Sequence, residues 1–112
     1  VLQGFPSDFG PVKIGNNVMI YSGVLLGHHS TIHDHCWLTS GVNIGGNASI
    51  GDSSFLGMNS TVGHMVEIGK QCFIGAGALV LKNAKEDGVY ITAGTNRYQL
   101  DSMDFLRLTK MC

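Results

Sequence analysis

Charged side chains and proline are scarce in this 112-residue chain. Asp, Glu, Lys and Arg make up 13% of it, about half of the roughly 25% usual in soluble domains. Seven Lys and Arg nearly balance eight Asp and Glu, so no basic stripe is available to neutralise a phosphate backbone, and we expect no nucleic-acid partner. With 44% hydrophobic residues and a net charge of -1, the composition also argues against disorder.

The chain also lacks a long apolar run and a disulfide framework. No apolar stretch reaches the ~18 residues of a membrane-spanning helix, and no charged start with an apolar stretch and a cleavage site marks a secretory signal. Cysteine occurs only at positions 36, 72 and 112. Such sparse cysteines suit a reducing compartment, so we expect a cytoplasmic protein without a membrane span.

Glycine, by contrast, is abundant and follows a six-residue repeat. Branched aliphatic residues occupy every sixth position from Ile14 to Val80, and Gly is the next residue in eight of these hexads. The aliphatic positions are Ile14, Ile20, Leu26, Ile32, Leu38, Ile44, Ile50, Leu56, Val62, Ile68, Ile74 and Val80. A period of six fits neither the 3.6 of a helix nor the 2 of a long strand. It predicts short strands separated by corners.

Each hexad also has a small or modest residue two places before the aliphatic one. Residues two apart on a strand point to the same side, so both face a shared interior. Gly tolerates the backbone geometry of the corners, and so do asparagines at positions 17, 47, 59 and 83. The hexads therefore coil around one core as a parallel β-helix.

The repeat resembles that of the hexapeptide-repeat family, whose motif is an aliphatic residue, a small residue or Gly, two variable residues, a small residue and one more. The resemblance covers residues 12–83. It implies an all-β fold, a single-stranded left-handed parallel β-helix of about four triangular coils of eighteen residues. The left hand comes from the family and opposes the usual right-handed crossover.

Three segments are expected along the chain. Residues 1–11 are a lead-in that we expect to continue from a removed upstream part, residues 12–83 are the hexapeptide-repeat β-helix, and residues 84–112 are a C-terminal loop and helix. Asp101 or Ser102 can cap this helix, and Met103, Leu106 and Met111 have roughly helical spacing up to about residue 110. We expect this segment to pack on the coil or on a neighbouring subunit.

Coils of eighteen residues place the outward side chains in columns, with neighbours about 4.8 Å apart. One column holds Met19, Trp37, Phe55 and Phe73, which we name the aromatic ridge. An exposed apolar patch of this kind usually marks an interface. Family members are typically trimers with active sites between subunits, so the resemblance implies a homotrimer.

Four of the five histidines lie within eight residues, at positions 28, 29, 33 and 35. All four fall at predicted corners and not at inward positions. Histidine exchanges protons near neutral pH and is the commonest metal ligand. The cluster is therefore the best sequence indication of chemistry, although polar corner residues remain the alternative for each histidine.

The string Leu26-Gly27-His28 resembles the catalytic hexad of acyltransferases of this fold, and residues 27–83 resemble bacterial acetyltransferases that modify sugars of surface polysaccharides. The resemblance implies acetyl-CoA as co-substrate, and a sugar or nucleotide-sugar hydroxyl or amine as acceptor. It makes His28 the general base, with His29 and His35 as substitutes. A backbone N–H at a glycine-rich corner would bind the oxyanion of the intermediate.

The same resemblance indicates where CoA would bind. The corner with Gly75, Ala76 and Gly77 would let the pantetheine arm lie against the coil. Lys82, Lys85 or Arg97 would contact the phosphates, with ordinary surface as the alternative for each.

Two other functions remain open. His28 and His33 resemble zinc ligands of the γ-class carbonic anhydrases, but zinc catalysis needs three protein ligands. His64 shares the column of His28 at about 9.6 Å, two coils away, which is too far for one ion, so no metal is expected. The third hypothesis is a catalytically silent solenoid or assembly module.

Overall fold

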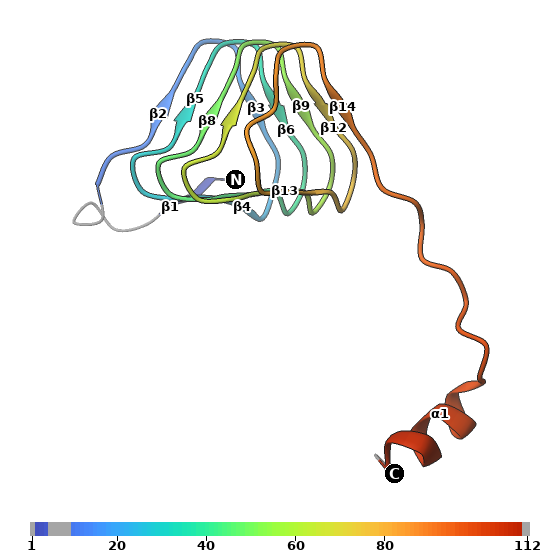
Figure 1. Cartoon of the computed structure of the whole chain (residues 1–112). Helices are drawn as coiled ribbons and strands as arrows, with labels where there is room; N and C mark the ends of the chain where they lie inside the picture. Colours follow the sequence, from blue (N-terminus) through green and yellow to red (C-terminus); the bar gives the residue numbers. More distant parts are fainter. Residues whose placement is uncertain (1, 5–9, 111–112) are drawn as a thin grey trace.

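The computed structural model describes residues 2–4 and 10–110 and shows a parallel β-helix with a C-terminal arm (Figure 1). Its strands are β1 (Leu2–Gly4), β2 (Lys13–Ile14), β3 (Met19–Ile20), β4 (Val24–Leu26), β5 (Thr31–Ile32), β6 (Trp37–Leu38), β7 (Asn43–Ile44), β8 (Ser49–Ile50), β9 (Phe55–Leu56), β10 (Thr61–Val62), β11 (Glu67–Ile68), β12 (Phe73–Ile74), β13 (Leu79–Val80) and β14 (Val89–Tyr90). One helix follows, α1 (Ser102–Thr109). The short strands and the single helix confirm the predicted fold class.

The strands form three parallel sheets, one on each side of the coil. The strand order is β1-β4-β7-β10-β13 in the first sheet, β11-β8-β5-β2 in the second and β14-β12-β9-β6-β3 in the third. Residues eighteen apart are partners, as Thr31 and Ser49 are between β5 and β8. The predicted coil of three hexads is therefore correct, and the repeat makes about four turns.

The core consists of the predicted inward residues from Val24 onward, whereas Ile14, which the repeat also directs inward, is 39% exposed because it lies in the first coil. The aliphatic positions from Leu26 to Val80 are at most 7% exposed, and each fully buried Leu or Ile contributes about 1.5–3 kcal/mol. Small residues fill the narrow places between them, and Ser30 Oγ donates a 2.7 Å hydrogen bond to the Gly27 carbonyl. Burial raises the pKa of the Cys36 thiol, which lies in the core.

Tight corners explain the glycine content. A Cβ on Gly27 would lie 2.5 Å from the Gly46 nitrogen of the next coil, so no larger residue fits between the stacked corners. Other corners need a left-handed residue, and His29 (φ 58°) and His35 (φ 61°) take this conformation. Two of the clustered histidines are thus held at defined places by the backbone.

The coil extends past both ends of the uninterrupted repeat. Ala84 is buried and bridges to Ile68, and β14 pairs with β12. This last stretch is shifted by two residues, because Ile74 pairs with Tyr90, sixteen positions on. The next position in the new phase is Asn96, which is polar and cannot fill the core, so the coil ends there.

At the other end, β1 pairs in parallel with β4. Part of the predicted lead-in therefore belongs to the first sheet. The remainder of the lead-in, residues 5–9, lies outside the described residues.

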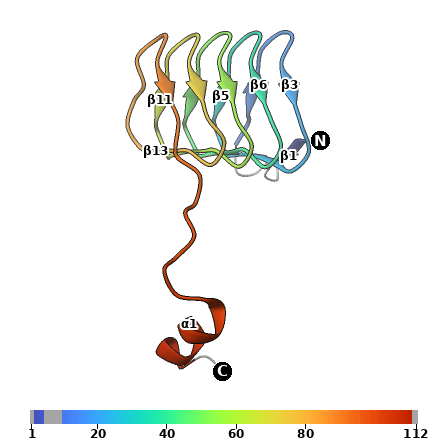
Figure 2. The same cartoon turned by 90° about the vertical axis from the view of Figure 1, so that its right-hand side faces the viewer.

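Beyond β14 the chain leaves the coil as an exposed arm that ends in α1, and both views show the helix standing away from the sheets (Figures 1 and 2). Asp101 caps α1 by accepting a hydrogen bond from the Asp104 N–H, and Lys110 ends it with φ 58°. Of the two predicted N-cap residues the structure uses Asp101, and the predicted end of the helix at about residue 110 is confirmed. No residue of α1 is buried, so packing on the coil is absent, and packing on a neighbour stays a prediction. Met111 lies outside the described residues.

The aromatic ridge is on the outer face of the third sheet, as predicted. Met19 and Trp37 are 43% exposed and Phe73 is 45% exposed. The rings of Phe55 and Phe73 stack with centroids 5.0 Å apart. In the part of the chain that the structure describes, no helix is long and apolar enough to cross a membrane.

Candidate functional site

The four clustered histidines separate onto two corners of the coil. His28 and His29 follow β4, at the corner between the first and second sheets. His33 and His35 follow β5, at the corner between the second and third sheets. Neighbourhood in the sequence therefore does not bring all four side chains into one site.

His33 and His35 make local contacts with surface residues. His33 Nε2 lies 3.3 Å from Ser49 Oγ, and His35 Nδ1 lies 3.0 Å from the Asn17 side-chain amide. Both histidines are exposed. These contacts fit the polar corner alternative and leave His35 apart from His28, for which it was a predicted substitute.

His28 and His29 contact each other directly. Their Nδ1 atoms are 3.2 Å apart, and the rings meet edge to face with centroids 5.5 Å apart. The His29 N–H donates to the Pro11 carbonyl, and the His29 ring covers Gly10, where a Cβ would collide with it. His29 is thus held by His28 on one side and by Gly10 and Pro11 on the other. His28 is half-buried.

His64 belongs to the same group and lies nearer to His28 than the predicted separation of about 9.6 Å. Its ring centroid is 6.2 Å from that of His28, although two coils of backbone separate the two positions. The residue between them in the column is Gly46, and a Cβ there would lie 2.6 Å from His28 Nε2. The rings approach because the intermediate position has no side chain. The available signal was a glycine midway between two histidines thirty-six positions apart.

A shallow groove of about 380 Å³ contains both rings. Gly45 and Gly46 line it at the corner, and Asn43 and Thr61 line it on the first sheet. Within the described chain, the Gly46 N–H has no hydrogen-bond acceptor. The groove is thus lined by two imidazoles and by no Asp, Glu, Lys or Arg. The backbone N–H groups of His28 and His64 likewise have no acceptor among the described residues.

The residues of the zinc alternative do not come together. His28 and His33 lie at the two ends of β5, on different corners. Over residues 2–4 and 10–110, no three His, Cys, Asp or Glu side chains converge as a metal site.

The predicted CoA-binding residues are also divided within one chain. Gly75 and Ala76 line a groove of about 450 Å³ on the third sheet, beside Phe73. Gly77 and Lys82 line a second groove, of about 720 Å³, at the end of the coil. Arg97 lies in the arm, near α1. Among residues 2–4 and 10–110, three different grooves divide these residues between them.

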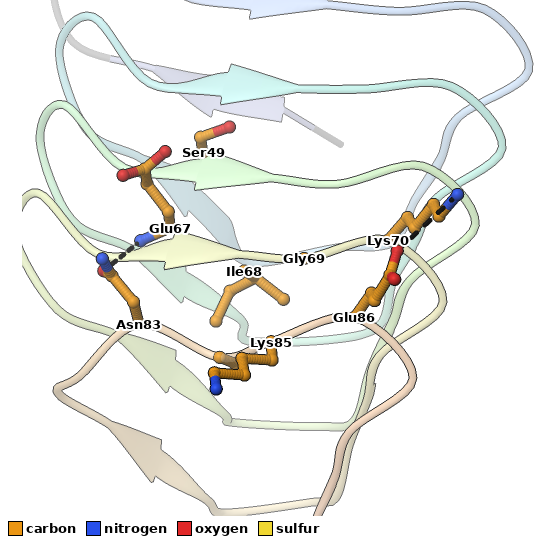
Figure 3. Close-up of a pocket in the computed structure, with 9 residues that line it drawn as sticks. Ser49, Glu67, Ile68, Gly69, Lys70, Asn83, Lys85 and Glu86 are labelled. Atoms are coloured by element: carbon orange, nitrogen blue, oxygen red, sulfur yellow. Dashed lines mark hydrogen bonds and ion pairs between the residues drawn. The ribbon is translucent and has the colours of Figure 1, made fainter.

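A further groove, of about 560 Å³, lies on the second sheet (Figure 3). Its polar groups largely engage one another. Lys70 and Glu86 form an exposed ion pair at 3.6 Å, and the Asn83 side-chain oxygen accepts a hydrogen bond from the Glu67 N–H. These contacts connect successive coils and leave the histidine corner as the better candidate site.

Comparison with known proteins agrees with this architecture. Residues 47–82 match the family described as bacterial transferase hexapeptide (six repeats). The three parallel sheets continue the same hexad repeat on both sides of these residues, so the chain resembles this family in its repeat and in its fold. No curated protein is significantly similar to it.

Several solved structures resemble the chain. PerB from Caulobacter crescentus, in complex with CoA and GDP-perosamine, is 24% identical with a TM-score of 0.59, over 79% of this chain and 49% of PerB. The acetyltransferase domain of PglB from Neisseria gonorrhoeae is 15% identical (TM-score 0.39, 80% and 53% covered). Serine acetyltransferase isoform 3 from Entamoeba histolytica, in complex with cysteine, is 20% identical (TM-score 0.44, 86% and 38% covered). The chain spans about half the length of PerB, and this likeness establishes the fold.

Proposed function

We propose that the chain is the β-helix of an acetyl-CoA-dependent acyltransferase that acts on a hydroxyl or amine of a sugar or nucleotide-sugar. The observation that carries the proposal is the groove in which the His28 ring lies over Gly46, whose N–H has no acceptor among the described residues. The hexapeptide-repeat family supports the reaction class. The nucleotide-sugar acceptor rests on the sequence resemblance to sugar acetyltransferases and on the ligands of PerB.

The contact between His28 and His29 supports His28 as the base. Only one proton can lie between their Nδ1 atoms, which are 3.2 Å apart. When His28 Nδ1 is the donor, His28 Nε2 carries the free electron pair. His28 Nε2 is also the ring atom nearest to the position that a Cβ on Gly46 would take. In this arrangement His29 is a positioning residue that fixes the tautomer of His28.

The reaction then proceeds at His28 Nε2. The acceptor oxygen or nitrogen attacks the thioester carbon while His28 Nε2 takes its proton. The new C–O or C–N bond forms, the C–S bond breaks, and the proton passes from His28 to the departing CoA sulfur. General base catalysis of this kind contributes about 10²–10⁴-fold in rate.

Gly46 is suited to stabilise the negative charge that develops on the thioester oxygen. Its N–H lacks a protein acceptor among the described residues, and it has no side chain to block approach. A backbone donor of this kind is worth about 10²–10³-fold in kcat. The predicted glycine-rich oxyanion corner is thus assigned to Gly46.

A homotrimer forms part of this proposal. The aromatic ridge leaves Trp37 and Phe73 nearly half exposed, and exposed apolar patches mark interfaces. A second subunit beside the histidine corner would close a groove that one chain leaves open, and would bring the divided CoA-binding residues of two chains toward each other. We place the enzyme in the cytoplasm, where the free thiols of Cys36 and Cys72 remain reduced.

Transfer is tested by the release of free CoA thiol from acetyl-CoA with a panel of nucleotide-linked amino and deoxy sugars. We expect His28→Ala to lower the rate by about 10²–10⁴-fold. His35→Ala is the matched control, because His35 lies at a different corner, and its rate should be unchanged. Absence of CoA binding by the native chain would overturn the proposal, and stoichiometric zinc in protein purified without added metal would favour the carbonic-anhydrase alternative.

A further inference from the structure

We propose that His64 binds the acyl donor, by a hydrogen bond to the first amide of its pantetheine arm. This inference rests on the proposed function. It starts from four residues that follow Gly10, each eighteen positions from the next, in the column along the corner between the first and second sheets. These four residues are His28, Gly46, His64 and Lys82.

Two geometric conditions set where the acetyl-CoA thioester lies along this column. Its carbon must lie within reach of an acceptor activated by His28 Nε2, and its oxygen must face the Gly46 N–H. Both conditions place it over Gly46. The remainder of the donor must leave from there along the coil.

One direction along the column is closed. Toward the N-terminal end, the His29 ring covers Gly10, and the His29 N–H is bonded to Pro11. Toward the C-terminal end, His64 is exposed. Within residues 2–4 and 10–110, no hydrogen bond engages its ring. The donor therefore passes His64.

The spacing fits the chemistry of the arm. The first amide nitrogen is three bonds from the thioester sulfur, a span of about 3.5 Å by analogy with one extended residue. Successive coils are about 4.8 Å apart. The amide thus reaches the level of His64, one coil from Gly46. An imidazole can donate to the amide oxygen or accept from its N–H, so the contact forms with either tautomer.

The experiment compares donors with and without this amide. With acetyl-CoA, His64→Ala should raise KM about 5–10-fold, the value of one neutral hydrogen bond, and change kcat little. The effect should persist with S-acetyl-N-acetylcysteamine, which retains the amide, and vanish with S-ethyl thioacetate, which lacks it. His64→Gln, whose amide also donates and accepts, should restore most of the loss. His33→Ala, an exposed histidine on another corner, should have no effect.

A binding measurement separates the possible failures. Calorimetry with CoA should give a Kd about 5–10-fold weaker for His64→Ala than for the native chain. Native protein that transfers acetyl groups, with His64→Ala unchanged in both Kd and KM, would overturn this inference alone. An equal loss with all three donors would also overturn it. Native protein that neither binds CoA nor transfers would overturn the proposed function as well. Circular dichroism checks folding, and His64→Gln replaces His64→Ala if the latter unfolds.

Discussion

The rings of His28 and His64 approach to 6.2 Å between centroids because Gly46 separates them in the corner column. Two coils of backbone would otherwise keep them about 9.6 Å apart. A side chain at position 46 would occupy the space into which His28 leans. The glycine thus serves the site in two ways, through the missing Cβ and through its free N–H.

Gly46→Ala should impair activity more than stability. The added Cβ would meet His28 Nε2 at 2.6 Å and displace the ring, and a misplacement of about 1 Å costs on the order of 10²-fold in rate. The measurement is kcat/KM beside the thermal midpoint. Gly94→Ala is the control, because a Cβ there meets nothing within 4 Å. An active Gly46→Ala enzyme would show that the His28 ring position is irrelevant.

His29→Asn should lower kcat about tenfold and leave KM for acetyl-CoA unchanged. Asn tolerates the left-handed backbone of position 29, at φ 58°, but its shorter side chain cannot hold His28 Nδ1 in the same place. His35→Asn is a matched control, since residue 35 has φ 61° and lies at the other corner. Steady-state kinetics test the pair, and equal effects of the two substitutions would argue against a positioning role for His29.

Trp37→Glu should dissociate the proposed trimer. The native chain should have a solution mass of three times 11.9 kDa by light scattering. A carboxylate in the aromatic ridge would leave a charge without a partner in an apolar interface, so the mass should fall to that of one chain. Lys13→Glu, on the second sheet, should remain trimeric. A monomeric native chain at micromolar concentration would refute the assembly.

Leu38→Ala should destabilise the coil by about 2–5 kcal/mol, the usual cost of removing a buried leucine side chain. Leu38 is 0% exposed. Leu25 is 45% exposed on the outer face of the first sheet, so Leu25→Ala should change the free energy of unfolding by less than about 0.5 kcal/mol. Urea unfolding measures both. Similar losses of unfolding free energy in the two variants would contradict the assignment of Leu38 to the core and of Leu25 to the surface.

Much of the fold is visible in the sequence because its rule is local. The aliphatic residue of each hexad, such as Leu38, has to face inward, and Trp37 beside it then has to face outward. The caps of α1 are equally local, since Asp101 contacts a residue three positions on. By contrast, the regular hexad does not predict the extra strand β14, because its shift of two residues pairs Ile74 with Tyr90 and not with Thr92.

The sequence by itself determined short strands with inward aliphatic positions and outward neighbours, because residues two apart on a strand face the same side. The coil of eighteen residues, and with it the aromatic ridge, came from the resemblance to the hexapeptide-repeat family. Only the tertiary structure decided which histidines share a site. It separated His28 from His35, seven positions away, and joined it to His64, thirty-six positions away. The reason is physical: stacking sets which positions share a corner, and the side chain missing at Gly46 lets two rings lean into the same space.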